Sequence, residues 1–177
     1  MTCGRLILLT GPPGAGKTTV ARLLAESAAD HGVHLHGDDF FRVIRKGWTA
    51  PWLTASKAQN EVVIAASAAA AIHYARGGYE VVLEGIYTAW ALAEVVKDAR
   101  AADQPLDYIV LCPDLAVAAE RARTRPDDAV EDYAPFAPLH AEFAAADPRH
   151  RLDSGAEPPE ILAAKLRRGL EAGLYRL

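Results

Sequence analysis

The chain has 177 residues, of which 51% are hydrophobic and 24% are charged; this ordinary globular composition argues against wholesale disorder. Its formal net charge of −4 provides no broad electrostatic attraction for nucleic acid or for an anionic membrane surface. The two cysteines, Cys3 and Cys112, form no CxxC pair, which argues against a disulfide framework and against a zinc site.

No segment suggests a membrane or an export route. The longest apolar run, residues 62–72, is interrupted by Ser67 and is too short to span a bilayer. The N-terminus lacks the charged leader, the apolar stretch and the cleavage site of a secretory signal. We therefore expect a cytoplasmic protein that has neither nucleic acid nor a membrane as its partner.

Short apolar runs bounded by breakers alternate with helical patterns along the chain. The run Leu6–Leu9 ends at the turn-rich Gly11–Gly14, which is typical of a strand buried on both faces. Later, Gly77 and Gly78 end a long Ala-rich helix. In chain order we expect strands over 6–9, 33–36, 79–83, 106–111 and 149–152, and helices over 17–30, 40–46, 56–76, 88–102, 114–123, 138–146 and 158–173.

Strands that alternate with helices, each strand short and apolar, predict a mostly parallel sheet covered on both faces. No internal repeat or long linker interrupts this pattern, so we expect one α/β domain over residues 1–177. Residues 125–137 are rich in proline and acidic residues and offer few apolar anchors, so they are expected to form a small mobile lid.

The strongest motif is the octapeptide Gly11-Pro12-Pro13-Gly14-Ala15-Gly16-Lys17-Thr18, which matches G-x-x-x-x-G-K-[ST] between a predicted strand and a predicted helix. Its glycines let backbone N–H groups face a phosphate, and the helix adds its positive N-terminal end. Lys17 can reach the β- and γ-phosphates, and the Thr18 hydroxyl can ligate Mg²⁺. These residues and Thr19 are therefore predicted to bind ATP and Mg²⁺; the alternative is a glycine-rich turn with a chance lysine.

Two acidic residues follow predicted strands at the edge of the sheet where ligands bind. Asp38 comes after the second strand, where its carboxylate could accept a proton from a substrate hydroxyl, help to hold Mg²⁺, or both. The alternative is that Asp38 or Asp39 merely caps the next short helix. Glu84 follows the third strand in the Walker B position, where it could bind Mg²⁺ through water or contact the substrate; the alternative is an exposed strand-end acid.

A basic cluster at 121–125 ends a predicted helix beside the lid. Arginines at the edge of a lid can neutralise the charge that grows on a transferring phosphoryl group. Arg121 and Arg125 lie one turn apart on one face, so we expect these two to contact phosphate. The alternative is that the arginines complement the helix dipole and pair with the lid acids at 127–131.

The acceptor side is less well specified by the sequence. Two tryptophans on the loop 47–54 suggest an apolar or ring-bearing substrate; a hydrophobic lid packed on the next helix is the equal alternative. His34 and His36 share one strand face, a geometry that can ligate a metal, but no third ligand is evident, and we expect His36 to contact the substrate or to support a residue that does. The predicted substrate contacts are Asp38, Phe41, Trp52, Glu84 and Tyr87, and the predicted metal ligands are Thr18, Asp38 and Glu84.

These motifs, in this order, make the chain resemble the small P-loop kinases and phosphotransferases, among them gluconate kinase, shikimate kinase and the zeta-toxin kinases. The likeness is closest to chloramphenicol phosphotransferase-like proteins. It implies a three-layer α/β/α P-loop NTPase fold with a five-stranded parallel sheet in the order 2-3-1-4-5 and a small lid. It also implies Asp38 as the base, Arg121 and Arg125 on the phosphates, and Ser154 in a loop beside the adenine. The substrate-binding stretches of gluconate and shikimate kinases are absent, so neither acceptor carries over.

These patterns predict an ATP-dependent phosphotransferase that transfers the γ-phosphoryl group to a hydroxyl of a small molecule, such as an antibiotic or another metabolite. Its catalytic residues would be Lys17, Asp38, Arg121 and Arg125. A nucleoside or nucleotide kinase is the alternative among enzymes, and a nucleotide-dependent regulatory ATPase is a further alternative. A GTPase is disfavoured, because no Asn/Thr-Lys-x-Asp stretch follows a late strand. We expect a monomer or a homodimer.

Overall fold

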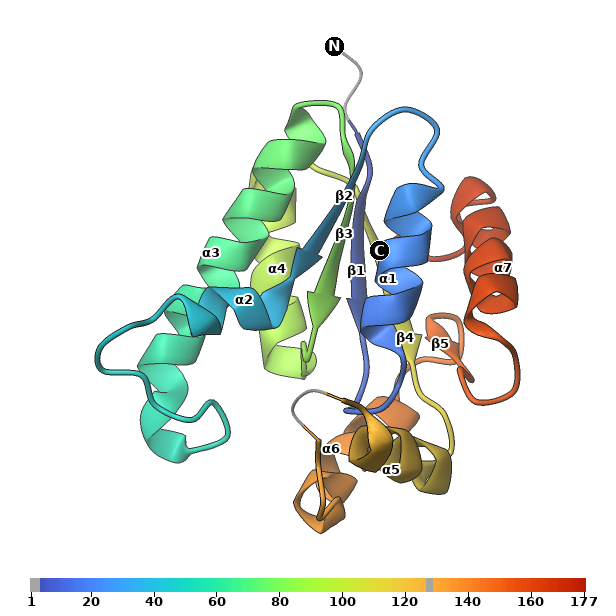
Figure 1. Ribbon diagram of the computed structural model, residues 1–177. Coiled ribbons are helices and arrows are strands. Elements are labelled where there is room, and N and C mark those ends of the chain that lie inside the picture. Colours follow the sequence, from blue (N-terminus) through green and yellow to red (C-terminus); the bar gives the residue numbers. More distant parts are fainter. Residues whose placement is uncertain (1–3, 127–128) are drawn as a thin grey trace.

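The computed structural model describes residues 4–126 and 129–177, and it has three layers, with a sheet between two layers of helices (Figure 1). The strands are β1 (Leu6–Thr10), β2 (Gly32–His36), β3 (Glu80–Gly85), β4 (Leu106–Leu111) and β5 (Arg151–Leu152). They pair in parallel in the order β2-β3-β1-β4-β5. The predicted α/β fold and its strand order are confirmed.

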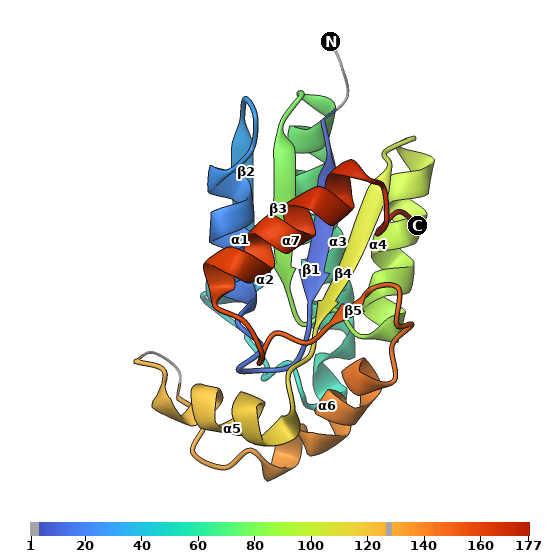
Figure 2. The same cartoon turned by 90° about the vertical axis from the view of Figure 1, so that its right-hand side faces the viewer.

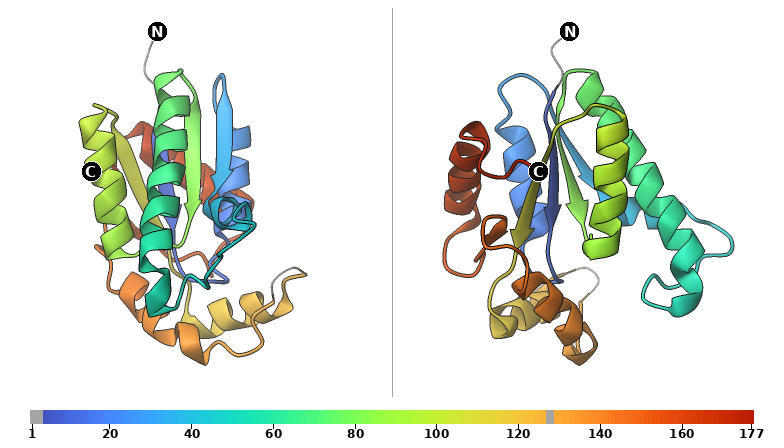
Figure 3. Two further views of the ribbon diagram at one scale, coloured as in Figure 1. Left: turned by 90° about the vertical axis from the view of Figure 1, so that its left-hand side faces the viewer. Right: turned by 180° about the vertical axis from the view of Figure 1, so that it is seen from behind.

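Four helices cover the sheet. The first pair, α1 (Lys17–Glu26) and α7 (Pro159–Glu171), lies on one face, and α3 (Lys57–Arg76) and α4 (Ala89–Ala101) lie on the other (Figure 2, Figure 3). Alternation along β1 creates a core on each side: Leu6 and Leu8 pack toward α3 and α4, whereas Ile7 and Leu9 pack toward α1 and α7.

The other helices lie near the carboxyl ends of the strands. These are α2 (Gly37–Arg42), α5 (Leu115–Thr124) and α6 (Ala137–Ala144), with short 3₁₀ turns at Thr54–Ser56 and Ala134–Phe136. The segment between α2 and α3 projects away from the sheet, on the side opposite α7 (Figure 1, Figure 3). None of the described helices is long and apolar enough to cross a membrane.

Several predicted boundaries shift by a few residues, and two of these shifts affect the site. Helix α2 begins at Gly37 with His36 at its N-cap, so Asp38 and Asp39 lie in its first turn. The capping role considered for these two aspartates is therefore wrong. Strand β3 continues to Gly85 instead of ending at 83, which makes Glu84 a strand residue with strand hydrogen bonding on both sides.

The lid has an apolar anchor that its composition did not predict. Tyr133 is buried in a small cluster with Ala118, Ala122, Val130 and Phe136. Its hydroxyl donates a hydrogen bond to the Pro13 carbonyl oxygen at 2.8 Å. Burial raises the pKa of Tyr133 to about 12, so the hydroxyl remains a donor at neutral pH. The lid is thus attached to α5 and to the phosphate loop; residues 127–128 of the predicted lid lie outside the described residues.

Candidate active site

The phosphate loop joins β1 to α1 through two glycines in the left-handed conformation, Gly14 (φ 77°) and Gly16 (φ 82°). A Cβ on Gly14 would lie 2.0 Å from the carbonyl oxygen of Ala118 in α5, so only a glycine lets the loop pass this close to the helix. Gly16 turns the chain directly into the first residue of α1. The loop therefore curls around the N-terminus of α1, an arrangement that binds anions.

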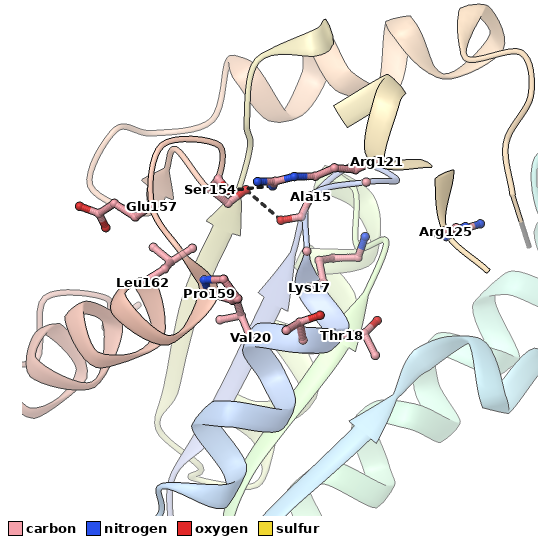
Figure 4. A pocket seen from close by; sticks show the side chains of 13 residues that line it. Ala15, Lys17, Thr18, Val20, Arg121, Arg125, Ser154, Glu157, Pro159 and Leu162 are labelled. Carbon is pink, nitrogen blue, oxygen red and sulfur yellow. Dashed lines mark hydrogen bonds between the residues drawn. The ribbon is translucent and has the colours of Figure 1, made fainter. Parts of the chain in front are cut away.

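A cavity of about 430 Å³ opens beside this loop (Figure 4). Its walls come from the loop and the start of α1, from the end of α5, and from the segment that leads into α7. The lining residues are Gly14, Ala15, Gly16, Lys17, Thr18, Thr19, Val20, Arg121, Arg125, Ser154, Glu157, Pro159 and Leu162. The structure thus brings together residues 14–19, Arg121, Arg125 and Ser154, which the sequence predicted, whereas residues 11–13 are buried outside this lining.

Lys17 lies at the electrostatic centre of the site. Its ammonium donates a hydrogen bond to the Pro12 carbonyl oxygen at 3.0 Å. Burial lowers the pKa of Lys17, the carboxylates of Glu84 and Asp38 raise it, the Arg125 charge lowers it, and the net result is a lowered pKa. The charges of Glu84 in β3, Asp38 in α2 and Arg125 after α5 thus all affect the pKa of Lys17, although these residues come from three separate elements.

Ser154 connects the phosphate loop to α5. Its hydroxyl donates to the Ala15 carbonyl oxygen at 2.8 Å, and its own carbonyl oxygen accepts from Arg121 Nη1 at 2.8 Å (Figure 4). Arg125 lies across the cavity from Ser154 (Figure 4). Arg123, by contrast, forms an exposed ion pair within α5. The two arginines predicted to contact phosphate are thus the two that line the cavity.

Four lining residues were missed by sequence reasoning, namely Val20, Glu157, Pro159 and Leu162. Val20 follows the predicted Thr19 in α1, and the other three extend the cavity from Ser154 along the first turn of α7 (Figure 4). Pro159 and Leu162 could have been predicted from their spacing, because Pro159 begins a helix shortly after the Ser154 loop and Leu162 lies one helical turn further on. Proline and leucine give this end of the cavity an apolar wall, in contrast to its charged opposite end.

Glu84 is buried at the carboxyl end of β3, with a side chain only 1% exposed; the alternative of an exposed strand-end acid is wrong. Its Oε1 accepts a hydrogen bond from Thr18 Oγ1 at 2.9 Å and lies 3.1 Å from His36 Nε2 and 3.6 Å from His34 Nε2. Burial raises the pKa of Glu84, but His34, the Lys17 charge, His36 and the Thr18 hydroxyl outweigh burial, and the net pKa is lowered. The carboxyl group is therefore held as a carboxylate.

The oxygen donors beside Lys17 suit Mg²⁺, which prefers a few protein oxygens together with phosphate oxygens and water. The Thr18 hydroxyl already contacts the Glu84 carboxylate, and Asp38 exposes a second carboxylate in the first turn of α2. Across residues 4–126 and 129–177, no three His, Cys, Asp or Glu side chains form a metal-binding cluster. With a bound nucleotide, these residues would hold Mg²⁺ together with phosphate oxygens.

The predicted substrate contacts lie at different depths. Asp38 is exposed, with its charge acting on Lys17, and Phe41 is half-buried one turn later. Tyr87 is 1% exposed, and its hydroxyl lies 3.0 Å from Ser67 Oγ of α3. The prediction of a direct substrate contact through Tyr87 is wrong, because the ring is enclosed between the sheet and α3.

The loop between α2 and α3 exposes its central tryptophan. Trp52 is 76% exposed, so its ring does not form a hydrophobic lid packed on the helix. Polar contacts hold the loop instead: Gln59 of α3 bonds both the N–H and the carbonyl oxygen of Thr49, at 2.8 and 2.7 Å, and Asn60 donates to the Pro51 carbonyl oxygen at 2.8 Å. The Trp52 ring thus stands free of the helix surface.

Comparison with solved structures places this fold among known P-loop kinases. The APS kinase CysC of Mycobacterium tuberculosis, in complex with AMPPNP and APS, has a TM-score of 0.74 and 18% identity, over 97% of this chain and 99% of that chain. The tunicamycin resistance protein of Deinococcus radiodurans has a TM-score of 0.66 and 17% identity, over 98% of both chains. A gluconokinase from Sinorhizobium meliloti 1021 has a TM-score of 0.61 and 20% identity, over 98% of this chain and 99% of that chain.

At these identities the likeness shows the fold, and it confirms the predicted resemblance to the small P-loop kinase group. No curated protein matches the chain. The family comparison is more specific, because residues 6–148 match the AAA domain family AAA_33. This match begins with β1 and contains the phosphate loop, Asp38, Glu84 and both cavity arginines. Since it spans more than half of the sequence, the chain belongs to the AAA domain family AAA_33.

Proposed function

We propose that the protein is a kinase that transfers the γ-phosphoryl group of ATP to a hydroxyl group of a small molecule. The observation that carries this proposal is the convergence of Asp38 and Glu84, at the ends of two neighbouring strands, on Lys17 of the phosphate loop. A phosphate loop alone would serve any P-loop NTPase. An exposed carboxylate beside the loop adds what a kinase needs, a proton acceptor for an incoming hydroxyl.

In this proposal the two acidic residues, Asp38 and Glu84, have different roles. Asp38, which is exposed, accepts the proton of the attacking hydroxyl and can also help to hold Mg²⁺. Glu84, which is buried against Thr18, holds Mg²⁺ together with the Thr18 hydroxyl. Bound Mg²⁺ neutralises charge on the β- and γ-phosphate oxygens. The difference in exposure therefore separates proton transfer from metal binding.

The nucleotide would extend from Lys17 along the cavity. Residues 11–19 would cradle the phosphates, and Arg121 and Arg125 would stabilise the charge that grows on the transferring group. The apolar wall formed by Pro159 and Leu162 suits the flat face of a purine. Ser154 lies between these two ends of the cavity (Figure 4), which favours its proposed place beside the nucleotide.

Two observations favour a small acceptor over the alternatives. Arg121 is held by Ser154 of the same chain, so the site has its own arginine and does not depend on one from a neighbour, as a regulatory ATPase often does. Two of the solved structures that share the fold are named as kinases and one as an antibiotic resistance protein. We therefore propose a metabolite or an antibiotic as acceptor, with residues 1–177 acting as one domain.

The test is release of ADP from Mg²⁺·ATP in the presence of three acceptor sets: sugar acids, nucleosides and hydroxylated antibiotics. We expect one set to accelerate ADP release and to yield a phosphate ester, detected by mass spectrometry. The Lys17→Ala variant, purified in the same way, controls for contaminating kinases. ADP release that no acceptor changes would favour the regulatory ATPase, and esters formed only on nucleosides would favour the nucleoside kinase.

A further inference from the structure

Two histidines, His34 and His36, lie next to each other on one face of β2, beside the proposed magnesium site. His36 is the register partner of Glu84 on β3, and His34 is the partner of Val82. Side chains that alternate along a strand share one face, and this face is the one that Val82 turns toward α1 and α7. The neighbouring residues Val33 and Leu35 pack against the opposite core. Edge strand β2 therefore turns two imidazoles, rather than apolar side chains, toward Glu84.

The contacts of Glu84 are concentrated on one of its two oxygens. Thr18 Oγ1, His36 Nε2 and His34 Nε2 all approach Oε1, at 2.9, 3.1 and 3.6 Å. These three contacts therefore meet at the same oxygen atom. Thr18 and His36 lie at hydrogen-bond distance and His34 lies farther away, so turning the carboxylate would break the two short contacts at once.

The ring nitrogens of the two histidines are poorly supplied with hydrogen-bond partners. Their side chains are 22% and 23% exposed. Among the described residues, His34 Nε2 and His36 Nδ1 are buried and form no hydrogen bond, and the approach of His34 Nε2 to Glu84 is 3.6 Å long. A buried ring nitrogen that makes no hydrogen bond costs about 1–3 kcal/mol. Apolar residues at these two positions would avoid that cost, so stability alone does not account for the pair.

We propose that His34 and His36 are positioning residues that hold the Glu84 carboxylate, through its Oε1 oxygen, in the orientation in which it would bind the Mg²⁺ that accompanies the nucleotide. This inference rests on the proposed kinase function. The histidines touch neither the nucleotide nor the metal in this scheme; they act only through Glu84. Groups that orient a metal-binding residue in this way typically change metal affinity or activity by about 10–100-fold when they are removed.

The test measures metal binding directly, so it needs no acceptor. Mn²⁺, used as a spectroscopic probe for Mg²⁺, is titrated into the full chain with a non-hydrolysable ATP analogue and followed by electron paramagnetic resonance. We expect His36→Leu to weaken Mn²⁺ binding about tenfold, and His34→Leu with His36→Leu to weaken it further. His36→Gln, whose amide nitrogen can take the place of Nε2, should restore most of the affinity.

Two controls separate this role from a purely structural one. His73 lies exposed on α3, so His73→Leu should leave Mn²⁺ binding unchanged. Binding of the analogue in the presence of EDTA should be the same in the wild type and in every variant, because the histidines do not touch the phosphates. If the Leu variants unfold, His36→Asn, which is polar but too short to reach Oε1 in the same way, provides the same measurement.

Three results are decisive. Equal Mn²⁺ affinity in the wild type, His36→Leu and His36→Asn would overturn the positioning role. An equal loss of analogue binding with and without metal would overturn it as well, by showing that the histidines support the phosphate loop. A wild-type protein that binds the analogue but never binds Mn²⁺ with it would instead refute the proposed kinase function, which this inference requires.

Discussion

The nucleotide side and the acceptor side of the site are built in different ways. On the nucleotide side, β1 is fully buried and leads into a loop whose carbonyl oxygens at Pro13 and Ala15 accept hydrogen bonds from the buried hydroxyls of Tyr133 and Ser154. On the acceptor side, the loop between α2 and α3 is attached to the fold by two amide side chains of α3, and Trp52 stays 76% exposed. The nucleotide side is therefore packed within the fold, whereas the loop on the acceptor side projects from it and is held by few contacts.

This difference has a physical reason. A triphosphate presents the same charged oxygens whatever the reaction, so curled backbone and a few cations suffice to bind it. An acceptor is recognised by side chains of matching shape and polarity, and these can change on an appended loop without disturbing the core. The contrast teaches that changes on the nucleotide side should abolish chemistry, whereas changes on the acceptor side should alter selectivity.

The largest effect is expected at Asp38, where the two sides meet. Asp38→Asn keeps the size and polarity of the side chain but removes the proposed base, so phosphoryl transfer should fall about 10²–10⁴-fold. Nucleotide affinity should stay close to the wild-type value, because the loop, Lys17 and Thr18 are intact. The measurements are the transfer rate and calorimetric titration with an ATP analogue.

The matched control for this change is Asp39→Asn in the same helical turn, where the exposed carboxylate pairs with Arg42 at 3.0 Å. Asp39→Asn should transfer phosphate at nearly the wild-type rate. A near-wild-type rate in Asp38→Asn would instead assign the proton transfer to another group, with Glu84 the next candidate. Loss of Mg²⁺·nucleotide binding in Asp38→Asn would make Asp38 chiefly a metal ligand.

The second largest effect is expected on the nucleotide side, at Lys17. Lys17→Ala removes a charge-assisted contact to phosphate worth about 1.5–3 kcal/mol, so ATP affinity or turnover should fall at least about tenfold. Titration with ATP and steady-state turnover measure the change. Lys97→Ala, on the exposed surface of α4, serves as the control and should have no effect. Unchanged binding and turnover in Lys17→Ala would contradict the assignment of the whole phosphate site.

A smaller effect is expected where the lid is attached. Tyr133→Phe removes only the hydrogen bond to the Pro13 carbonyl oxygen, a loss of about 0.5–1.5 kcal/mol. Hydrogen exchange at residues 129–137 should become about two- to twelvefold faster, and a bound ATP analogue with Mg²⁺ should reduce the difference. Tyr79→Phe is the control, because that tyrosine is partly exposed and directly precedes β3, at the opposite end of the strand from the site. Equal exchange in Tyr133→Phe and the wild type would show that this hydrogen bond does not restrain the lid.

The smallest effect on stability is expected on the acceptor side. Trp52→Ala should change the free energy of unfolding by less than about 0.5 kcal/mol, because the ring is largely exposed. If the ring contacts the acceptor, the KM for the acceptor should rise about two- to fivefold, which corresponds to 0.5–1 kcal/mol for one ring contact, while the KM for ATP is unchanged. Leu174→Ala, an exposed apolar residue near the end of α7, is the control. An unchanged KM for the acceptor would remove Trp52 from the proposed substrate contacts.

Much of the nucleotide side could be predicted from local sequence. The phosphate loop needs eight consecutive residues, because a turn of fixed shape followed by a helix creates the anion site without help from distant segments. The strand order followed from a family resemblance, and the short apolar runs already indicated a parallel sheet. Asp38 and Glu84 were found because the carboxyl ends of parallel strands meet at one edge.

What local patterns could not supply are contacts between residues far apart in the chain. The Ser154 hydroxyl bonds to Ala15, Tyr133 bonds to Pro13, and Glu84 collects Thr18 and two histidines of β2. Each contact depends on which strands become neighbours and which way their side chains point, and neither is encoded within a short window. Tyr87 illustrates the limit: it lies two residues after the end of β3 and three after Glu84, yet its side chain is buried against α3.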